Sequence, residues 1–402
     1  MKWEKVKLGE LYEVHNGLSK AGKFFGEGYP FLTFSTVFNN YFIPKQITDL
    51  VQSTEKEQES YSIRRGDVFV TRTSETSDEL GMSCVALKDY PMATYNGFTK
   101  RMRPITNRVL PEYIGYYMRL PNFRGEFRAF STMTTRASLR NEDLLGLEVK
   151  LPSIEIQKQI ADILSAYDDL IENNQKQIKL LEEAAQRLYK EWFVDLRFPG
   201  HENTKIVDGV PEGWQWCKVR DVADINSSAL PKNYKEDFID YVDLGSVRCG
   251  HIETRARYNL NEAPGRAKRC AKDGDIIWGM VRPNLKAYAL VTNPKETDVF
   301  STGFAVLSAK KVPYSYLYCA VTQEEFVGYL VNATNGAAYP AVKPVHFEVA
   351  DILKPDDKVL EQFHSVADSI YRKKEALENQ NHNLRESRDL ILPKLMSGEV
   401  EV

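Results

Sequence analysis

The sequence predicts an α+β chain in which two mixed, strand-rich globular domains are separated by two long helices that form an antiparallel intramolecular coiled coil. An internal repeat is the main reason. Residues 152–188 and 355–391 carry the same apolar periodicity at an offset of 203, and residues 3–11 are echoed by residues 214–222 at an offset of 211. Heptad spacing over five successive positions in both copies is typical of helices that pack against a partner. We therefore expect a tandem, pseudo-twofold internal duplication.

The first globular domain is expected to occupy residues 1–150. Alternating apolar residues lead up to a break at Asn16-Gly17, and short apolar runs predict strands near residues 29–34, 67–72, 84–87 and 97–99. A helix should begin after Pro111, where apolar and aromatic residues recur at helical spacing. This domain is therefore mostly strand, with a few helices.

The first long helix and its flanks are assigned to residues 151–198. Ser153 is a good N-cap, because its hydroxyl can accept a hydrogen bond from the first helical turn, and Pro152 cannot continue a helix behind it. About forty residues at 1.5 Å per residue would give a rod of roughly 60 Å. Residues 199–213, which close with Pro211-Glu212-Gly213, are interpreted as a linker.

The second globular domain is expected at residues 214–354, followed by the second helix and tail at residues 355–402. Strands are predicted near residues 239–242, 275–278 and 304–307, and a single helix over residues 314–330. Gly66-Asp67 of the first domain reappears as Gly274-Asp275, and Gly97-Phe98 as Gly303-Phe304. The predicted strands of the two domains therefore correspond.

The heptads define a predicted seam between the two helices. Its members are Ile160, Leu164, Tyr167, Ile171, Asn174, Ile178, Leu181 and Leu188 in the first helix, and Phe363, Ile370, Leu377, Leu384 and Ile391 in the second. The alternate positions of the second helix hold Ala367, Lys374, Asn381 and Arg388, so its seam is partly polar. Asn174 could meet Gln380 or Asn381 and set the register of the pair, or it could face solvent.

Composition and charge exclude several classes of protein. The chain of 402 residues is 43% hydrophobic and 27% charged, which suits folded domains, and its net charge of −3 argues against a general polyanion binder. No apolar signal core opens the sequence and no run of about eighteen apolar residues could span a bilayer, so a cytoplasmic protein is expected. The five cysteines have no zinc-like spacing.

One stretch is strongly basic, because residues 100–140 hold nine lysines and arginines against two glutamates. Such a stretch can present a positive face to phosphates, or it can be a solvated surface paired with acids from elsewhere in the fold.

Catalytic motifs are missing from the sequence. Residues 17–24 nearly match a phosphate-binding G-x-x-x-x-G-K-[ST] loop, but Phe24 stands where the magnesium-binding hydroxyl should be. No G-x-S-x-G, H-E-x-x-H or G-x-G-x-x-G motif occurs either. We expect no catalytic residue, no metal site and no cofactor on this chain.

Three motifs at the ends of the helices carry a family resemblance. They are residues 151–160 (LPSIEIQKQI), residues 191–193 (EWF) and residues 392–399 (LPKLMSGE). With the duplication, they make the whole chain resemble a specificity subunit of a Type I restriction-modification system. The resemblance implies that residues 1–150 and 214–354 are target recognition domains, each reading one half of a bipartite double-stranded DNA target. It implies that the helices set the spacing and dock two methyltransferase subunits.

The same resemblance places S-adenosylmethionine, and ATP with Mg²⁺ where DNA is cleaved, on partner subunits. It leaves open whether two restriction (nuclease/translocase) subunits join the complex. No membrane partner is implied.

Candidate DNA-binding residues are polar or basic residues in loops at matching places of the two copies. Arginine and asparagine suit base edges, whereas lysine and serine more often hold phosphate. The candidates are Ser19, Lys20, Arg72, Thr73, Lys100, Arg101, Thr135, Arg136 and Arg140 in the first copy, and Ser227, Ser228, Arg282, Asn284, Lys286, Tyr339 and Lys343 in the second. The alternative for Arg72 and Arg282 is a structural ion pair.

Two other classes of protein were weighed. A catalytic methyltransferase or nuclease would need a cofactor loop or clustered carboxylates, which the sequence lacks. A purely structural coiled-coil adaptor would leave the large, aromatic-rich domains unexplained.

Overall fold

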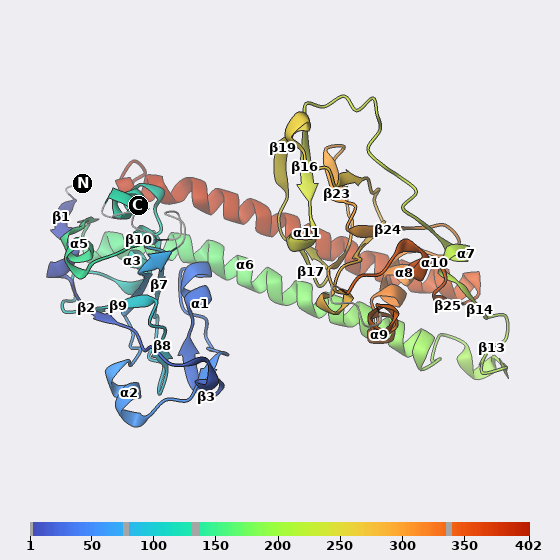
Figure 1. Cartoon of the computed structure of the whole chain (residues 1–402), viewed down its shortest axis with the longest axis horizontal. Coiled ribbons are helices and arrows are strands. Elements are labelled where there is room, and N and C mark those ends of the chain that lie inside the picture. Colours follow the sequence, from blue (N-terminus) through green and yellow to red (C-terminus); the bar gives the residue numbers. More distant parts are fainter. Residues whose placement is uncertain (1–2, 75–79, 130–136, 335–339) are drawn as a thin grey trace. The chain divides into compact units, whose positions relative to one another are not determined.

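The computed structural model describes residues 3–74, 80–129, 137–334 and 340–402. The chain divides into two compact units, one made of residues 1–172 and 381–402 and the other of residues 173–380. Each unit holds one globular domain and part of both long helices (Figure 1). Within these described ranges, no helix is long and apolar enough to cross a membrane.

The first globular domain is built on a four-stranded antiparallel sheet with the order β2-β9-β5-β7. A second sheet, β4-β3-β8, contains one parallel pair, and β1 pairs with β11 where the domain begins and ends. The elements are β1 (Glu4–Lys7), η1 (Leu8–Glu10), β2 (Tyr12–Asn16), η2 (Gly22–Phe24), β3 (Phe25–Leu32), α1 (Phe34–Asn39), β4 (Leu50–Val51), α2 (Glu55–Ser60), β5 (Val68–Thr71), β6 (Thr73–Ser74), β7 (Ser83–Val85), β8 (Thr94–Tyr95), β9 (Thr99–Pro104), α3 (Pro111–Tyr117), α4 (Pro121–Ala129), β10 (Ala137–Ser138), α5 (Asn141–Gly146) and β11 (Glu148–Leu151).

The second globular domain repeats this topology. Its central sheet has the order β15-β24-β21-β22, its second sheet β19-β16-β23-β20 again holds one parallel pair, and β14 pairs with β25 as β1 does with β11. The elements are η5 (His201–Asn203), β12 (Ile206–Val207), β13 (Val210–Pro211), β14 (Gln215–Lys218), α7 (Val219–Val222), β15 (Ala223–Ile225), β16 (Phe238–Val242), η6 (Leu244–Ser246), β17 (Val247–Arg248), β18 (His251–Ile252), β19 (Ala256–Asn259), η7 (Leu260–Glu262), β20 (Ala267–Arg269), β21 (Ile276–Gly279), η8 (Pro283–Leu285), β22 (Tyr288–Leu290), β23 (Asp298–Ser301), β24 (Phe304–Ala309), α8 (Tyr314–Val321), α9 (Glu324–Ala333), α10 (Pro344–Glu348) and β25 (Asp351–Lys354).

The predicted duplication is thus present strand by strand in the central sheet, with one shift of alignment. Thr71 of β5 lies opposite Thr99 of β9, and Gly279 of β21 lies opposite Phe304 of β24. Thr99 therefore corresponds to Phe304, so Phe98 corresponds to Gly303. The sequence match of Gly97-Phe98 with Gly303-Phe304 is off by one residue, because the loop before the strand differs in length.

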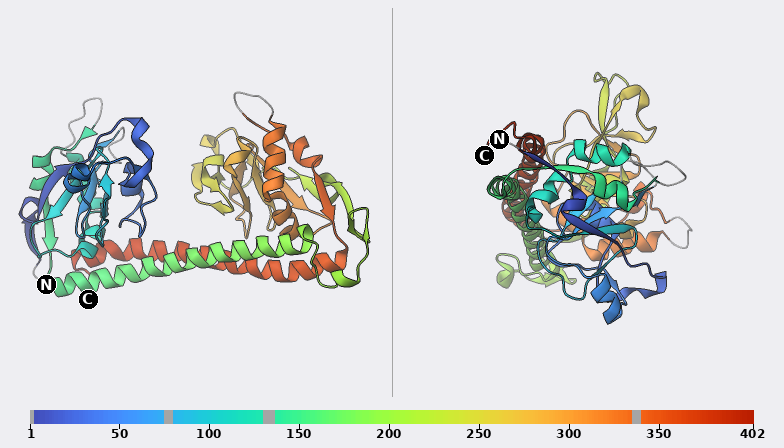
Figure 2. Two further views of the ribbon diagram at one scale, coloured as in Figure 1. Left: turned by 90° about the horizontal axis from the view of Figure 1, so that it is seen from below. Right: turned by 90° about the vertical axis from the view of Figure 1, so that its left-hand side faces the viewer.

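The two long helices, α6 (Ile154–Tyr189) and α11 (Asp357–Ser397), lie side by side and run in opposite directions within each unit (Figures 1 and 2). In the first unit, Asp168 of α6 contacts Arg388 of α11. In the second unit, Asn174 bonds Gln380, while the ring of Tyr189 packs against that of Phe363. Residue numbers rise along one helix as they fall along the other, as an antiparallel coiled coil requires. A π-helical turn, η4 (Lys190–Val194), extends α6.

Burial along the helices follows the predicted seam in part. Ile160, Leu164, Ile171, Asn174, Ile178, Phe363 and Leu377 are buried, whereas Tyr167, Leu181, Leu188, Ile370, Leu384 and Ile391 are half-buried. In α11 the alternate positions Ala367, Lys374 and Asn381 are 0%, 5% and 3% exposed, so they are buried like Phe363 and Leu377, whereas the other apolar heptad positions of this helix are only half-buried. Each domain packs on one side of the helix pair, and its side chains decide which positions are covered.

The helix predicted over residues 314–330 is instead two helices, α8 and α9, that break at Thr322-Gln323. The Thr322 hydroxyl donates to the Tyr318 carbonyl of its own helix. Gln323 has extended backbone angles and is the N-cap of α9, which opens with Glu324 and Glu325. Acidic residues in a first turn favour a new start because they complement the helix dipole.

Candidate nucleic-acid interface

In both domains, three segments far apart in sequence meet at one end of the central sheet. In the first domain, the Arg72 amide donates to the Phe98 carbonyl (3.0 Å) and the Arg72 carbonyl accepts from the Leu139 amide (3.0 Å). In the second, Met280 does the same with Gly303 (2.9 Å) and Val342 (2.8 Å). We call these two places the first and second sheet ends.

The backbone of the first sheet end is closely packed. The Leu18 amide donates to the Tyr95 carbonyl, and a Cβ added to Gly17 would lie 2.1 Å from the Asn96 oxygen. A Cβ on Gly97 would lie 2.3 Å from the Ser19 hydroxyl. Glycine is needed at both positions for this approach of two loops. Ser19, an exposed candidate, is therefore held beside the loop that carries Gly97.

A polar cluster lies at the first sheet end. Lys100 of β9 is paired in the sheet with Asn16 of β2, and its ammonium group donates to the side-chain oxygen of Asn141. A guanidinium nitrogen of Arg72 lies 3.4 Å from the Asn16 oxygen. Burial, with a further contribution from the charge of Arg72, lowers the pKa of Lys100. Arg140, the N-cap of α5, is 68% exposed at its side chain, with Asp143 at 2.8 Å.

Two candidates lie away from this end. The Lys20 ammonium group pairs with Glu57 at 2.8 Å and donates to the Gln52 carbonyl. Arg101, adjacent to Lys100, points to the opposite face of the sheet because side chains alternate along a strand. It is 3% exposed, donates to the Ser62 carbonyl at 2.8 Å, and could not reach a duplex without unfolding the domain. Burial lowers the pKa of Arg101. We therefore leave Lys20 and Arg101 out of the interface.

The second sheet end has its own exposed polar group. Arg282 and Lys286 both adopt left-handed backbone angles (φ of 49° and 53°) around the short turn η8, in which Asn284 is exposed. Lys343 is exposed and is the N-cap of α10. The ammonium group of Lys286 is paired with Glu324. Ser227 and Ser228 are exposed just after β15. Candidates Thr135, Arg136 and Tyr339 lie outside the described residues, as does the side chain of Thr73.

Strand register makes the two sheet ends comparable, and their chemistry differs. Tyr12 lies opposite Pro104 and Ala223 lies opposite Ala309, so the polar residues of the first end have defined counterparts. Four polar residues change character: Asn16, Arg72, Lys100 and Asn141 correspond to Ser227, Met280, Ala305 and Pro344. One positive charge is kept, since Arg140 corresponds to Lys343, and both are exposed N-caps. The fold presents the same surface twice with different side chains.

The arginines that the structure describes within the basic stretch 100–140 do not all lie on one positive face. Arg103 pairs with the fully buried Asp67 at 2.6 Å, and the hydrogen bonds that it donates to the Asp67 carboxylate raise the pKa of Arg103. Arg119 donates to the carbonyls of Ser83, Val37, Phe38 and Asn40. Burial lowers the pKa of Arg119 to about 10. Of the two interpretations of this stretch, internal pairing accounts for these arginines.

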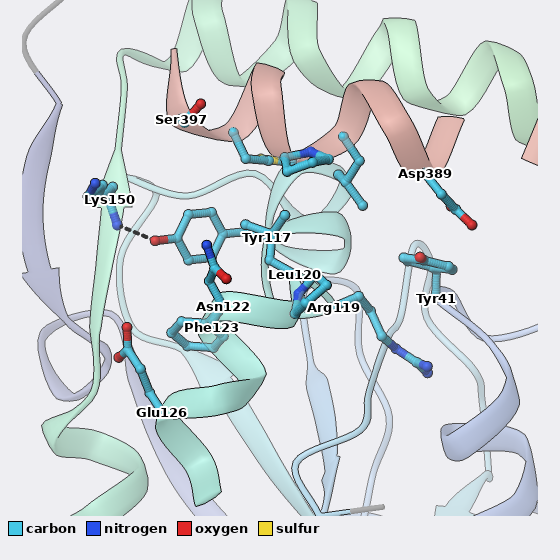
Figure 3. Close-up of a pocket in the computed structure, with 14 residues that line it drawn as sticks. Tyr41, Tyr117, Arg119, Leu120, Asn122, Phe123, Glu126, Lys150, Asp389 and Ser397 are labelled. Atoms are coloured by element: carbon cyan, nitrogen blue, oxygen red, sulfur yellow. Dashed lines mark hydrogen bonds between the residues drawn. The ribbon is translucent and has the colours of Figure 1, made fainter. Parts of the chain in front are cut away.

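A pocket of about 430 Å³ lies elsewhere in the first unit, between α3, α4 and the last turns of α11 (Figure 3). Its walls are mainly apolar, with Tyr117, Phe123 and Met396 among them, and the Tyr117 hydroxyl accepts from the Lys150 amide at 3.0 Å. No candidate DNA-binding residue lines it. Among the described residues, no group of three or more His, Cys, Asp or Glu side chains is placed to hold a metal ion.

Sequence reasoning missed several residues at these ends. Asn16 and Asn141 come together with Lys100 only because β2, β9 and α5 pack at this end, whereas the sequence indicates no more than a break at Asn16-Gly17. Phe98 and Leu285 are apolar, so a search for polar candidates passed over them, yet their side chains are exposed.

A duplicated fold with two chemically different sheet ends and an antiparallel helix pair defines a two-domain recognition protein. Comparison with known proteins agrees. Residues 1–183 match the family described as the Type I restriction modification DNA specificity domain. The Type I restriction enzyme MjaIX specificity subunit of Methanocaldococcus jannaschii is 26% identical over 100% of this chain and 94% of its own length. The HindI specificity subunit of Haemophilus influenzae is 22% identical over 99% of both.

The crystal structure of the Type I restriction-modification S subunit from M. genitalium has the same fold, with a TM-score of 0.57 and 14% identity over 98% of this chain and 96% of that one. The chain is therefore similar along nearly its whole length to specificity subunits of Type I restriction enzymes, and residues 1–183 match the DNA specificity domain of these proteins.

Proposed function

We propose that this chain is the DNA-recognition subunit of a Type I restriction-modification complex, in which each globular domain reads one half of a bipartite target through its sheet end. The helix pair sets the gap between the half-sites and docks two methyltransferase subunits. The relatives are specificity subunits of Type I restriction enzymes, which supports this role. The proposal includes the limits of the two recognition domains, residues 1–150 and 214–354. It also includes a cytoplasmic location for the protein.

The observation that carries the proposal is the contrast between the two sheet ends. Arg72 at the first end has Met280 as its counterpart at the second. An arginine can donate two hydrogen bonds to guanine O6 and N7, which a methionine cannot. The exposed cation shared by both ends, Arg140 or Lys343, suits phosphate, which is the same for every sequence. One fold with a constant phosphate contact and different base contacts would read two different half-sites.

No cofactor is assigned to this chain. S-adenosylmethionine, together with ATP and Mg²⁺ in complexes that cleave DNA, would be held by the partner subunits, and two restriction subunits would join only in such complexes.

The test selects bound sequences from a random double-stranded DNA pool, using the full chain assembled with its methyltransferase subunit. We expect two short sequences separated by a fixed gap. Arg72→Ala should relax one base position in one half-site and leave the other half-site unchanged. Arg65→Ala is the matched control: Arg65 precedes β5, Arg72 follows it, and the Arg65 side chain is half exposed and paired with Glu112. Selection of no sequence, or an equal effect of both variants, would refute the proposal.

A further inference from the structure

We propose that each sheet end also carries one apolar base contact: Phe98 in the first domain and Leu285 in the second each touch the 5-methyl group of a thymine in the major groove. The inference rests on the proposed function and concerns the thymine methyl group, an apolar group that the polar candidate residues do not recognise. Phe98 is 55% exposed and Leu285 is 60% exposed.

A single exposed apolar side chain on a surface is ordinary and would carry nothing alone. Phe98 differs from an ordinary exposed side chain because hydrogen bonds on both sides hold its backbone in one conformation. Its amide donates to the side-chain oxygen of Asn96 at 2.7 Å, and its carbonyl accepts from the Arg72 amide. Gly97, just before it, packs against Ser19 so closely that no Cβ fits. The loop therefore holds Phe98 in solvent, beside Arg72 and Ser19, and leaves it little freedom to fold back on the domain.

A short turn with left-handed backbone angles at both ends keeps the Leu285 side chain in solvent. Leu285 ends the turn η8 between Arg282 and Lys286, whose left-handed backbone angles are unfavourable for residues with a side chain. The Leu285 amide donates to the Arg282 carbonyl at 2.8 Å, and the Lys286 carbonyl accepts from the Cys249 amide at 2.9 Å. Pro283, at the start of the turn, is buried and anchors it. Strained backbone held by surrounding structure is typical of functional positions.

The surroundings of both side chains favour one kind of ligand. The Phe98 carbonyl accepts a hydrogen bond from the Arg72 amide, and Gly97 just before it lies against the Ser19 hydroxyl. Leu285 lies in one turn with the exposed side-chain amide of Asn284. The major groove displays hydrogen-bond donors and acceptors with a single apolar group, the thymine methyl, so an apolar side chain among polar ones matches that edge. An apolar wedge that unstacks base pairs from the minor groove is the competing mode.

The test replaces single thymines by deoxyuridine, which lacks only the methyl group, in a target selected by the wild-type complex. At one thymine of one half-site, the replacement should weaken binding of the wild-type complex by about fourfold, the loss expected when one buried methyl group is removed. Binding by a Phe98→Ala complex should not respond to that replacement. Leu285→Ala should remove the response at one thymine of the other half-site.

Matched controls carry equally exposed apolar side chains away from the sheet ends. Ile105, 58% exposed just beyond the other end of β9, serves for Phe98, and Ile206, 58% exposed on β12, serves for Leu285. Ile105→Ala and Ile206→Ala should keep both thymine responses. The wild-type response to deoxyuridine involves no altered protein, so a misfolded variant cannot obscure it.

The outcomes separate cleanly. If a target is selected but no thymine responds to deoxyuridine, the inference is wrong while the proposed function stands. An apolar wedge replaces the methyl contact if two results occur together. Phe98→Ala weakens binding although no thymine responds to deoxyuridine, and 2-aminopurine beside the site is fluorescent, and therefore unstacked, in the wild-type complex but not in the Phe98→Ala complex. If no sequence is selected at all, the proposed function itself fails.

Discussion

His251 Nδ1 lies 2.7 Å from Glu378 Oε1, so a hairpin of the second domain is attached to α11 by a charged hydrogen bond. The other ring nitrogen of His251 lies 3.3 Å from Glu182 of α6. Lys374, nearly buried, completes the group with Glu182 at 2.8 Å and the Gly250 carbonyl at 2.8 Å. One imidazole therefore joins the domain to both helices within this unit.

This arrangement predicts a loss of stability at alkaline pH. Hydrogen bonds with Glu182 and Glu378 raise the pKa of His251 from 6.5 to about 9. The contribution of protonated His251 is therefore complete below pH 6.5 and is lost as the pH rises through 9. With a third of the side chain exposed, solvent screening leaves about 1 kcal/mol. Urea unfolding of wild type and His251→Gln should converge by that amount between pH 6 and 9.5.

The control for that measurement is His382→Gln, since the side chain of His382 in α11 is 69% exposed and its ring pairs with Glu386, one turn away on the same helix. The difference between wild type and this variant should stay constant over the same pH range. A constant difference for His251→Gln as well would show that folding does not raise the pKa of His251.

A second ion pair, Asp168 with Arg388, should matter more than its neighbour. The two groups are 2.5 Å apart and their side chains are 29% and 12% exposed, and the Tyr116 hydroxyl also donates to Asp168 at 2.6 Å. Asp168→Asn leaves a largely buried guanidinium group with only the exposed carboxylate of Asp389 as countercharge, which should cost about 3 kcal/mol of unfolding free energy. Asp389→Asn, which removes a 58% exposed partner of Arg388, should cost under about 0.5 kcal/mol. Equal losses in urea titrations would contradict the assignment.

The Asn174 pair is expected to set helix register at a cost in stability. Asn174 is 4% exposed and its amide donates to the Gln380 oxygen at 3.1 Å. Asn174→Leu should raise the unfolding free energy by about 1 kcal/mol through apolar burial, while size-exclusion chromatography with light scattering shows more than one species. Asn173→Leu, at the exposed neighbouring position, should do neither. A single species from Asn174→Leu would contradict the register role.

The ruler model predicts a change in target spacing alone. A heptad inserted after Gln175, matched by one after Asn379, keeps the seam in phase and adds about 10 Å of helix. Sequence selection should then return the same two half-sites with a gap longer by about three base pairs, at 3.4 Å per pair. An insertion in α6 alone should instead reduce stability, because it breaks the pairing. New half-site bases at an unchanged gap would exclude the ruler.

The two basic candidates at the surface of the first domain should behave differently. Arg140→Ala should reduce the slope of log affinity against log salt by about one, the value for one lost phosphate contact. Lys20→Ala should leave the slope unchanged, because the Lys20 side chain is paired with Glu57 and only 15% exposed, whereas that of Arg140, although paired with Asp143, is 68% exposed. The reverse result would show that the salt bridge opens on binding and that the interface extends to α2.

Several features followed directly from the sequence. Heptads at an offset of 203 predicted both long helices, and the repeated Gly66-Asp67 and Gly274-Asp275 pairs marked equivalent strands. These signals are local, because caps, glycines and apolar spacing act over a few residues. Such local signals failed at residues 314–330. The apolar periodicity there predicts one continuous helix, but the chain forms two helices with a break at Thr322-Gln323.

The candidate site depended on contacts between distant segments. Lys100 and Arg101 are neighbours in sequence, but strand alternation sends Lys100 toward Asn141 and Arg101 into the domain. No local pattern separates a lysine that reaches an interface from one that, like Lys20, closes an ion pair.

By itself the sequence determined the duplication, the two heptad helices and the resemblance to a known family, because each depends on the spacing of residues along the chain or on a short motif. Only the tertiary structure decided which side chains share a sheet end, that Arg72 in one copy occupies the position equivalent to Met280 in the other, and that Phe98 and Leu285 stay in solvent. The physical reason is that a side chain's exposure and neighbours are set by strand register and loop closure between residues far apart in sequence.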